Sequence, residues 1–133
     1  MPLLDDVATQ LETAGCGTVG TTIFVGQMPD SVDAGLVLNE YGGAPPEFDL
    51  SDPGVHYELP HFQVFCRHTV YATGRALIES AYVALAKVVN QTLTSTQYLR
   101  IEPIQAPFQV NPPQDAQGRW EWFCNFQTQK ALG

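Results

Sequence analysis

Apolar residues recur at helical spacing in two parts of this chain. The first pattern lies at the N-terminus, with Asp5 and Asp6 near its positive end and Gly15 placed to stop it. The second begins at a possible N-cap, Thr69, and ends near Asn90. The first apolar face contains Leu4, Val7, Leu11 and Ala14, and the second contains Tyr71, Gly74, Ile78, Ala81, Tyr82, Leu85 and Val88 or Val89. These patterns predict two amphipathic helices.

Alternation of apolar and polar residues predicts strands elsewhere. Phe62, Val64 and Cys66 alternate with polar neighbours, and Leu99 and Ile101 are expected to face inward in a later strand. Inward positions near the C-terminus are Trp120, Trp122, Cys124 and Phe126. The five expected strands are Thr21 to Val25, Gly35 to Tyr41, 61 to 67, Tyr98 to Gln105 and Trp120 to Phe126.

The connections indicate how these strands are arranged. Turn-forming residues at 27 to 31 join the first two strands and predict a hairpin, and Pro112 to Gly118 predicts another with a projecting tip. The chain of 133 residues has the length of one domain. We therefore expect a single α+β domain, residues 1–133, with a mainly antiparallel sheet of about five strands and both helices packed on one face.

One segment breaks the regular pattern. The strand ending at Tyr41 meets Gly42 and Gly43, and Pro45 and Pro46 follow. Glycine permits positive φ, and proline lacks the N–H that a sheet ladder requires. We expect the chain to leave the sheet here as an acidic arm from Gly42 to Glu58, and long loops of this kind are commonly functional.

Charge is distributed unevenly along the chain. The net charge is −8 at pH 7, and residues 1 to 66 carry ten carboxylates and no Lys or Arg. All six cations lie from Arg67 to Lys130. The acidic half of one chain could meet the more basic half of another head to tail, and raising the salt concentration should then loosen the assembly. The alternative is that the acidic residues simply form a soluble surface. Tight nucleic-acid binding is disfavoured.

Cysteine usage and hydropathy suggest the cellular compartment. The three cysteines, Cys16, Cys66 and Cys124, have no paired spacing, and we expect reduced thiols in a cytosolic protein without a signal peptide. No apolar run reaches the roughly 20 residues of a membrane span. We expect no membrane partner.

Several motifs could carry binding or catalytic chemistry, but none has the context or spacing of a known site. Gly15 to Gly20 matches GxGxxG but follows a helix, whereas a dinucleotide site follows a strand, so a plain turn is expected. His56, His61, His68 and Cys66 could supply zinc ligands, and Asp30, Asp33, Glu47, Asp49 and Asp52 could gather calcium, but neither set has the spacing of a known site. We expect no cofactor, no metal and no enzymatic activity.

Seven segments, taken in order, carry a family resemblance. They are Leu3 to Asp6, Gly17 to Gly26, Glu40 to Glu47, the helix after Arg67, Leu93 to Ile101, Gln105 to Phe108, and Gly118 to Glu121. Their order and spacing resemble a tailed-bacteriophage family labelled "minor capsid protein", which is similar to the tail terminators of long-tailed phages. The most specific piece is Tyr41-Gly42-Gly43-Ala44-Pro45-Pro46.

The resemblance implies a structural virion protein at the head–tail junction, made in the cytoplasm of the bacterial host. It implies a homo-hexameric ring that caps the tail tube, contacts the head–tail connector protein and lets DNA pass through its lumen without specific binding. Candidate contacts lie in the arm, the helix after strand three and the second hairpin tip, Val110 to Gly118. The candidate interface residues are Tyr41, Gly42, Gly43, Pro45, Pro46, Glu47, Asp49, Asp52, His56, Tyr57, Arg75, Lys87, Asn111, Asp115 and Arg119.

Two rival functions remain open from the sequence. A head-completion or neck adaptor protein would use the same kind of interface on a different partner. A small acidic metal-binding enzyme or binding module belongs to another class, and a persistent monomer that binds a metal tightly would favour it.

Overall fold

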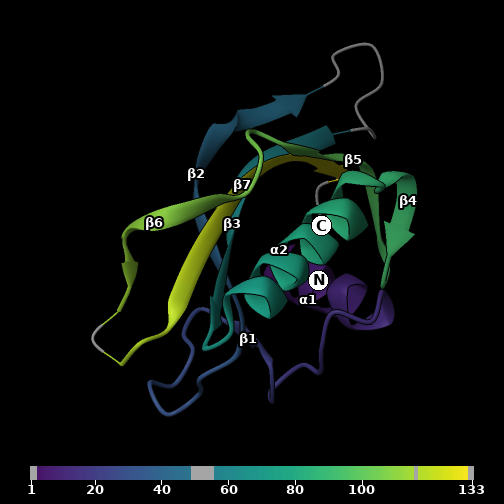
Figure 1. The fold of residues 1–133 in the computed structure, drawn as a ribbon. Helices are drawn as coiled ribbons and strands as arrows, with labels where there is room; N and C mark the ends of the chain where they lie inside the picture. Colours follow the sequence, from purple (N-terminus) through teal and green to yellow (C-terminus); the bar gives the residue numbers. More distant parts are fainter. Residues whose placement is uncertain (1–2, 49–55, 116, 132–133) are drawn as a thin grey trace.

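A curled seven-stranded sheet encloses two helices on one side (Figure 1). The computed structural model describes residues 3–48, 56–115 and 117–131. Its elements are α1 (Leu3–Thr13), β1 (Ile23–Val25), β2 (Gly35–Phe48), β3 (His56–His68), α2 (Tyr71–Ala86), β4 (Val89–Leu93), β5 (Thr96–Pro103), β6 (Phe108–Gln114) and β7 (Trp120–Ala131). The predicted α+β class, with two helices on one face of the sheet, is confirmed.

The sheet is mixed but mainly antiparallel. Its order is β1-β2-β3-β7-β5-β4, and β6 also pairs with β7. Only the β1–β2 pair is parallel among the described strands. Strand β7 is central, because it pairs with β3, β5 and β6.

The core lies between the sheet and the helices. Every second residue of β7 is buried from Trp122 to Lys130, and the alternation in β3 buries Phe62, Val64 and Cys66, as the sequence predicts. The rings of Phe62 and Phe126 stack with centroids 5.1 Å apart across the β3–β7 pair. Burial of such large side chains contributes most of the favourable free energy of folding.

The expected hairpin of the first two strands is wrong. Strand β1 runs parallel to β2, with Ile23 opposite Leu36. The chain turns at Gly26, whose φ is 86°, and loops back through residues 26–34 before entering β2. Arg67 of β3 donates hydrogen bonds to the carbonyls of Pro29 (3.4 Å) and Val32 (3.2 Å), which fixes this returning loop against the sheet.

The expected departure of the chain from the sheet at Gly42 is also wrong. Strand β2 continues to Phe48 and pairs with β3, with register shifts between Tyr41 and Ala44 and between Ala44 and Glu47. Prolines are tolerated at such bulges because the ladder is interrupted there. A Cβ on Gly43 would clash with the carbonyl oxygen of Leu59, so glycine permits close strand approach. The centre of the expected arm, residues 49–55, lies outside the described residues.

The remaining differences concern strand number and element ends. Strands β4 and β6 were not predicted. Helix α2 ends at Ala86 rather than near Asn90, and its N-cap is Val70, without a side-chain cap, rather than Thr69. In β5 the buried residues are Thr96, Tyr98 and Ile101, and Leu99 is only half-buried, because the register shifts between positions 98 and 100.

Candidate assembly surface

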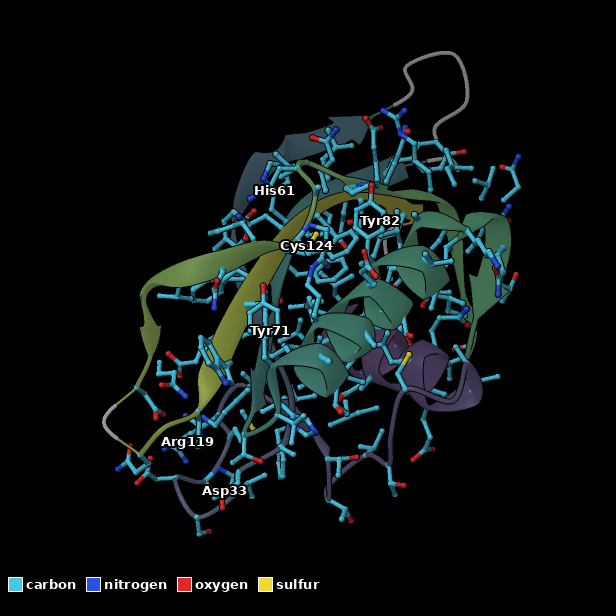
Figure 2. All side chains as sticks on the ribbon, viewed as in Figure 1. Asp33, His61, Tyr71, Tyr82, Arg119 and Cys124 are labelled. Atoms are coloured by element: carbon cyan, nitrogen blue, oxygen red, sulfur yellow. The ribbon has the colours of Figure 1, made fainter. Side chains whose placement is uncertain are left out.

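A buried arginine joins the tip of the β6–β7 hairpin to the loop before β2. The side chain of Arg119 is 3% exposed. Its Nε donates to Asp115 Oδ2 at 2.7 Å, one terminal nitrogen donates to Asp30 Oδ1 at 2.9 Å, and the other donates to the Asp30 carbonyl at 2.7 Å. Asp33 lies 3.5 Å from the same guanidinium. Figure 2 shows Arg119 and Asp33 close together at one end of the molecule.

This cluster is a rigid connection between two segments far apart in sequence. The hydrogen bond to Asp30 is the main cause that raises the pKa of Arg119 above its ordinary value, so the guanidinium stays charged. The side chains of Asp30 and Asp33 remain largely exposed. The sequence had suggested Asp30 and Asp33 as possible calcium ligands and Arg119 as an interface residue. In the fold, the Arg119 side chain is buried inside the subunit against these two carboxylates.

The opposite end of the sheet is formed by the end of β2 and the start of β3. Tyr41 is 41% exposed, and its ring meets that of His61 edge to face at 5.7 Å. Tyr57 is half-buried in β3. Pro45, Pro46 and Glu47 belong to β2 and His56 to β3, while Asp49 and Asp52 lie outside the described residues. This end and the β6–β7 hairpin project in different directions from the helices (Figure 1).

Most cations of the described residues form ion pairs within the chain. Lys130 is buried and lies 2.7 Å from Glu58, and the half-buried Arg75 lies 3.1 Å from Glu79, one helical turn away. The other pairs are Arg67–Glu121, Arg100–Glu102 and the Arg119 cluster. Lys87 is exposed and has no ion pair to a described residue. Lys87 therefore remains available for a contact with another molecule.

The exposed side of α2 contains an open hollow of about 480 Å³. Lys87 lies at its wall, whereas Arg75 does not contribute to the lining. The lining residues are Ala14, Ala76, Glu79, Ser80, Val83, Ala84 and Lys87. The remaining candidate, Asn111, lies in β6 near the hairpin tip.

The residues that the structure describes offer little catalytic chemistry. They contain no group of three or more His, Cys, Asp or Glu residues that could hold a metal ion. Burial raises the pKa of the Cys66 thiol to about 12 and that of Cys124 to about 12, so neither is a thiolate nucleophile at neutral pH. The Cys124 thiol instead donates to the Gln105 carbonyl at 3.2 Å. None of the described helices is long and apolar enough to span a membrane.

A family match favours the assembly interpretation. Residues 10–132 match the family model of the bacteriophage tail terminator protein. The chain belongs to this family. Tail terminators are structural proteins of the virion, and the chain is thus a structural protein of the tail and neck region.

The fold of this terminator also occurs in a solved particle. A chain from a structure titled "Virion of native gene transfer agent (GTA) particle" superposes with a TM-score of 0.64. The two chains are 16% identical, and the match covers 98% of this chain and 95% of that chain. A search of the curated proteins found no match. The solved chain therefore shares the fold of this chain across nearly its whole length.

Proposed function

We propose that this chain closes into a ring, a hexamer, that caps the tail tube and joins it to the head connector while DNA passes through the lumen. The observation that carries this proposal is the family match over residues 10–132, which spans every strand and α2. A ring requires a heterologous contact that closes on itself. The contact surfaces follow from two features of the fold.

The first feature is a set of strands at the edges of the sheet, of which β1 is bridged on its outer side only at Ile23, by Val19. Strands β1, β4 and β6 each pair with one neighbour among the described strands. Each also carries an exposed apolar side chain: Val25 is 42%, Val89 is 60% and Phe108 is 43% exposed. An unpaired edge with exposed apolar groups is suited to contact with another chain. These edges are the candidates for contact between neighbouring subunits.

The second feature is the pair of hairpins at different ends of the sheet (Figure 1). The β2–β3 end carries Tyr41, and the β6–β7 hairpin is stiffened by the buried Arg119. A capping ring must contact the tube on one face and the connector on the other. We assign one hairpin to each of these partners. We further infer that the chain catalyses no reaction, because its family is structural.

Electron microscopy of particles assembled without this chain tests the proposal. Tails longer than normal are expected, because nothing would stop polymerisation of the tube, and supply of the wild-type chain should restore normal length. Detached tails of normal length would instead identify a neck adaptor. Normal, attached tails would reject both functions.

A variant of an edge strand tests the ring itself. Val89→Lys places a charge at the exposed apolar position of β4 and is expected to reduce the ring-sized mass by at least tenfold in light scattering, whereas Val89→Ile should assemble normally. Equal assembly of the two variants would place the subunit contact elsewhere.

A further inference from the structure

A small polar pocket lies between α1 and the β4–β5 turn, apart from the surfaces assigned above. Its volume is about 180 Å³. The lining residues are Asp6, Thr9, Gln10 and Thr13 of α1, and Gln91, Thr92, Leu93 and Thr94 of β4 and its turn. Hydroxyl and amide groups form most of this wall, and α1 carries no Lys or Arg. The surroundings therefore offer hydrogen-bond acceptors but no cation.

The pocket contains a buried carboxylate that is only half satisfied. Asp6 is fully buried, and its Oδ2 accepts a hydrogen bond of 2.8 Å from the hydroxyl of Tyr98. Asp6 Oδ1 is also buried and has no hydrogen-bond partner among the described residues. Burial is the main cause that raises the pKa of Tyr98, so its hydroxyl remains a donor and Asp6 the acceptor. A buried carboxyl oxygen without a hydrogen-bond partner is unfavourable, so the site is suited to a ligand that donates to it.

The geometry selects the chemical class of that ligand. Tyr98 already donates to Oδ2 of Asp6, so only Oδ1 lacks a donor, and a single donor group satisfies this carboxyl without the two parallel bonds that a guanidinium forms. An ammonium group needs one carboxylate oxygen and can direct its other hydrogens to hydroxyl or amide oxygens such as those of Thr9 and Gln91. The side chain of Leu93 gives apolar contact to a methylene next to the nitrogen. We propose that this pocket binds one alkylammonium group, the end of a lysine side chain from another molecule in the virion.

Titration with a small probe tests the site directly. Methylammonium chloride should produce saturable shifts of the backbone amide signals of residues 91–94 in ¹⁵N NMR. Tetramethylammonium chloride at the same ionic strength carries the charge without the donors and should not. Asp6→Asn keeps an acceptor for Tyr98 and should weaken the methylammonium response at least tenfold. A response of equal strength in Asp6→Asn, or no saturable response in the wild-type chain, would overturn the proposal.

A second variant leaves the Asp6–Tyr98 hydrogen bond untouched. Gln10 lies one helical turn after Asp6, at the spacing at which a lysine pairs with an acidic residue on a helix. Gln10→Lys should fill the pocket with its own ammonium group and abolish the methylammonium response, while Gln10→Met should retain it. Full methylammonium binding in Gln10→Lys would contradict a site for a single ammonium group.

The source of the lysine can be distinguished as well. This chain has two lysines, and Lys130 is already buried against Glu58. If a second copy supplies Lys87, the same amide shifts should appear on raising the protein concentration and vanish in Lys87→Gln. If another virion protein supplies the lysine, the shifts should appear only when tail tubes or connectors are added. Failure of all these additions to shift the signals would reject a role for the pocket in assembly.

Discussion

At the scale of single residues, Arg119 shows how a cation in an acidic chain is used within the subunit. Its guanidinium is buried and is held by Asp30, Asp33 and Asp115. Removal of one member of such a cluster leaves the hairpin tip and the 26–34 loop without their shared anchor. Buried charge clusters are therefore costly to break, whereas exposed pairs contribute little.

Arg119→Met should lower the free energy of unfolding by about 2 to 4 kcal/mol, because a buried ion pair and several hydrogen bonds are lost. Arg100→Met removes an exposed pair with Glu102 and should change the same quantity by less than about 0.5 kcal/mol. Equilibrium unfolding in urea measures both. Equal losses would show that the cluster does not stabilise the fold.

The same cluster predicts a dependence of stability on pH. Partial burial tends to raise the pKa of Asp115, but hydrogen bonds from Arg119 and Gln117 outweigh it, and the pKa lies below its ordinary value of about 3.9. A carboxyl with a lowered pKa stabilises the folded state above that ordinary value, and the contribution is lost as pH falls through the folded pKa.

The difference in unfolding free energy between the wild-type chain and Asp115→Asn should therefore be constant near neutral pH and shrink below about pH 4. Urea unfolding at several pH values measures this difference, in which the titration of other carboxyls cancels. A difference that grows on acidification would contradict the assigned ion pair.

At the scale of elements, sequence patterns predicted the helices and strands that have long, regular periodicity. Helix α1 was predicted from helical spacing and strands β3 and β7 from alternation, and the buried core residues confirm these predictions. Strand β4 was missed because the helical pattern continues past Ala86, whereas the backbone enters the strand Val89–Leu93, in which Asn90 has a φ of 47°. The parallel β1–β2 pair was missed because Arg67 and Arg119 hold its loop from distant strands, and no local signal reports such contacts.

The packing of α2 on the sheet depends on Gly74. A Cβ there would clash with the ring of Trp122 and lie 2.7 Å from the Cβ of His68. Gly74→Ala should lower the free energy of unfolding by about 1 to 3 kcal/mol through overpacking, although alanine is the better helix former by about 1 kcal/mol. Ala76→Gly, at an exposed site on the same helix, should cost only about 1 kcal/mol. Thermal or urea unfolding compares them, and a stabilised Gly74→Ala would refute the close packing.

At the scale of the whole molecule, the sequence predicted the class of protein, whereas the contact surfaces stay a prediction. The ordered motifs indicated a tail terminator, and the family match agrees. The head-to-tail charge pairing could not be evaluated from the sequence, because pairing depends on which side chains meet in the fold. Apart from Lys87, every cation among the described residues has a carboxylate partner in the same chain. In the proposed ring, cations should thus contribute little to attraction between subunits.

This use of cations reverses the expected effect of salt. In the proposed ring, each subunit would carry a net charge of −8, with every described cation except Lys87 paired within its own chain, so neighbouring subunits should repel one another. Their repulsion is screened as the Debye length falls from about 30 Å at 0.01 M to about 8 Å at 0.15 M salt. Assembly through apolar strand edges should therefore increase with salt, as measured by light-scattering mass, and Lys87→Gln should follow the same trend. Dissociation on raising salt would instead show that ion pairs between subunits hold the ring together.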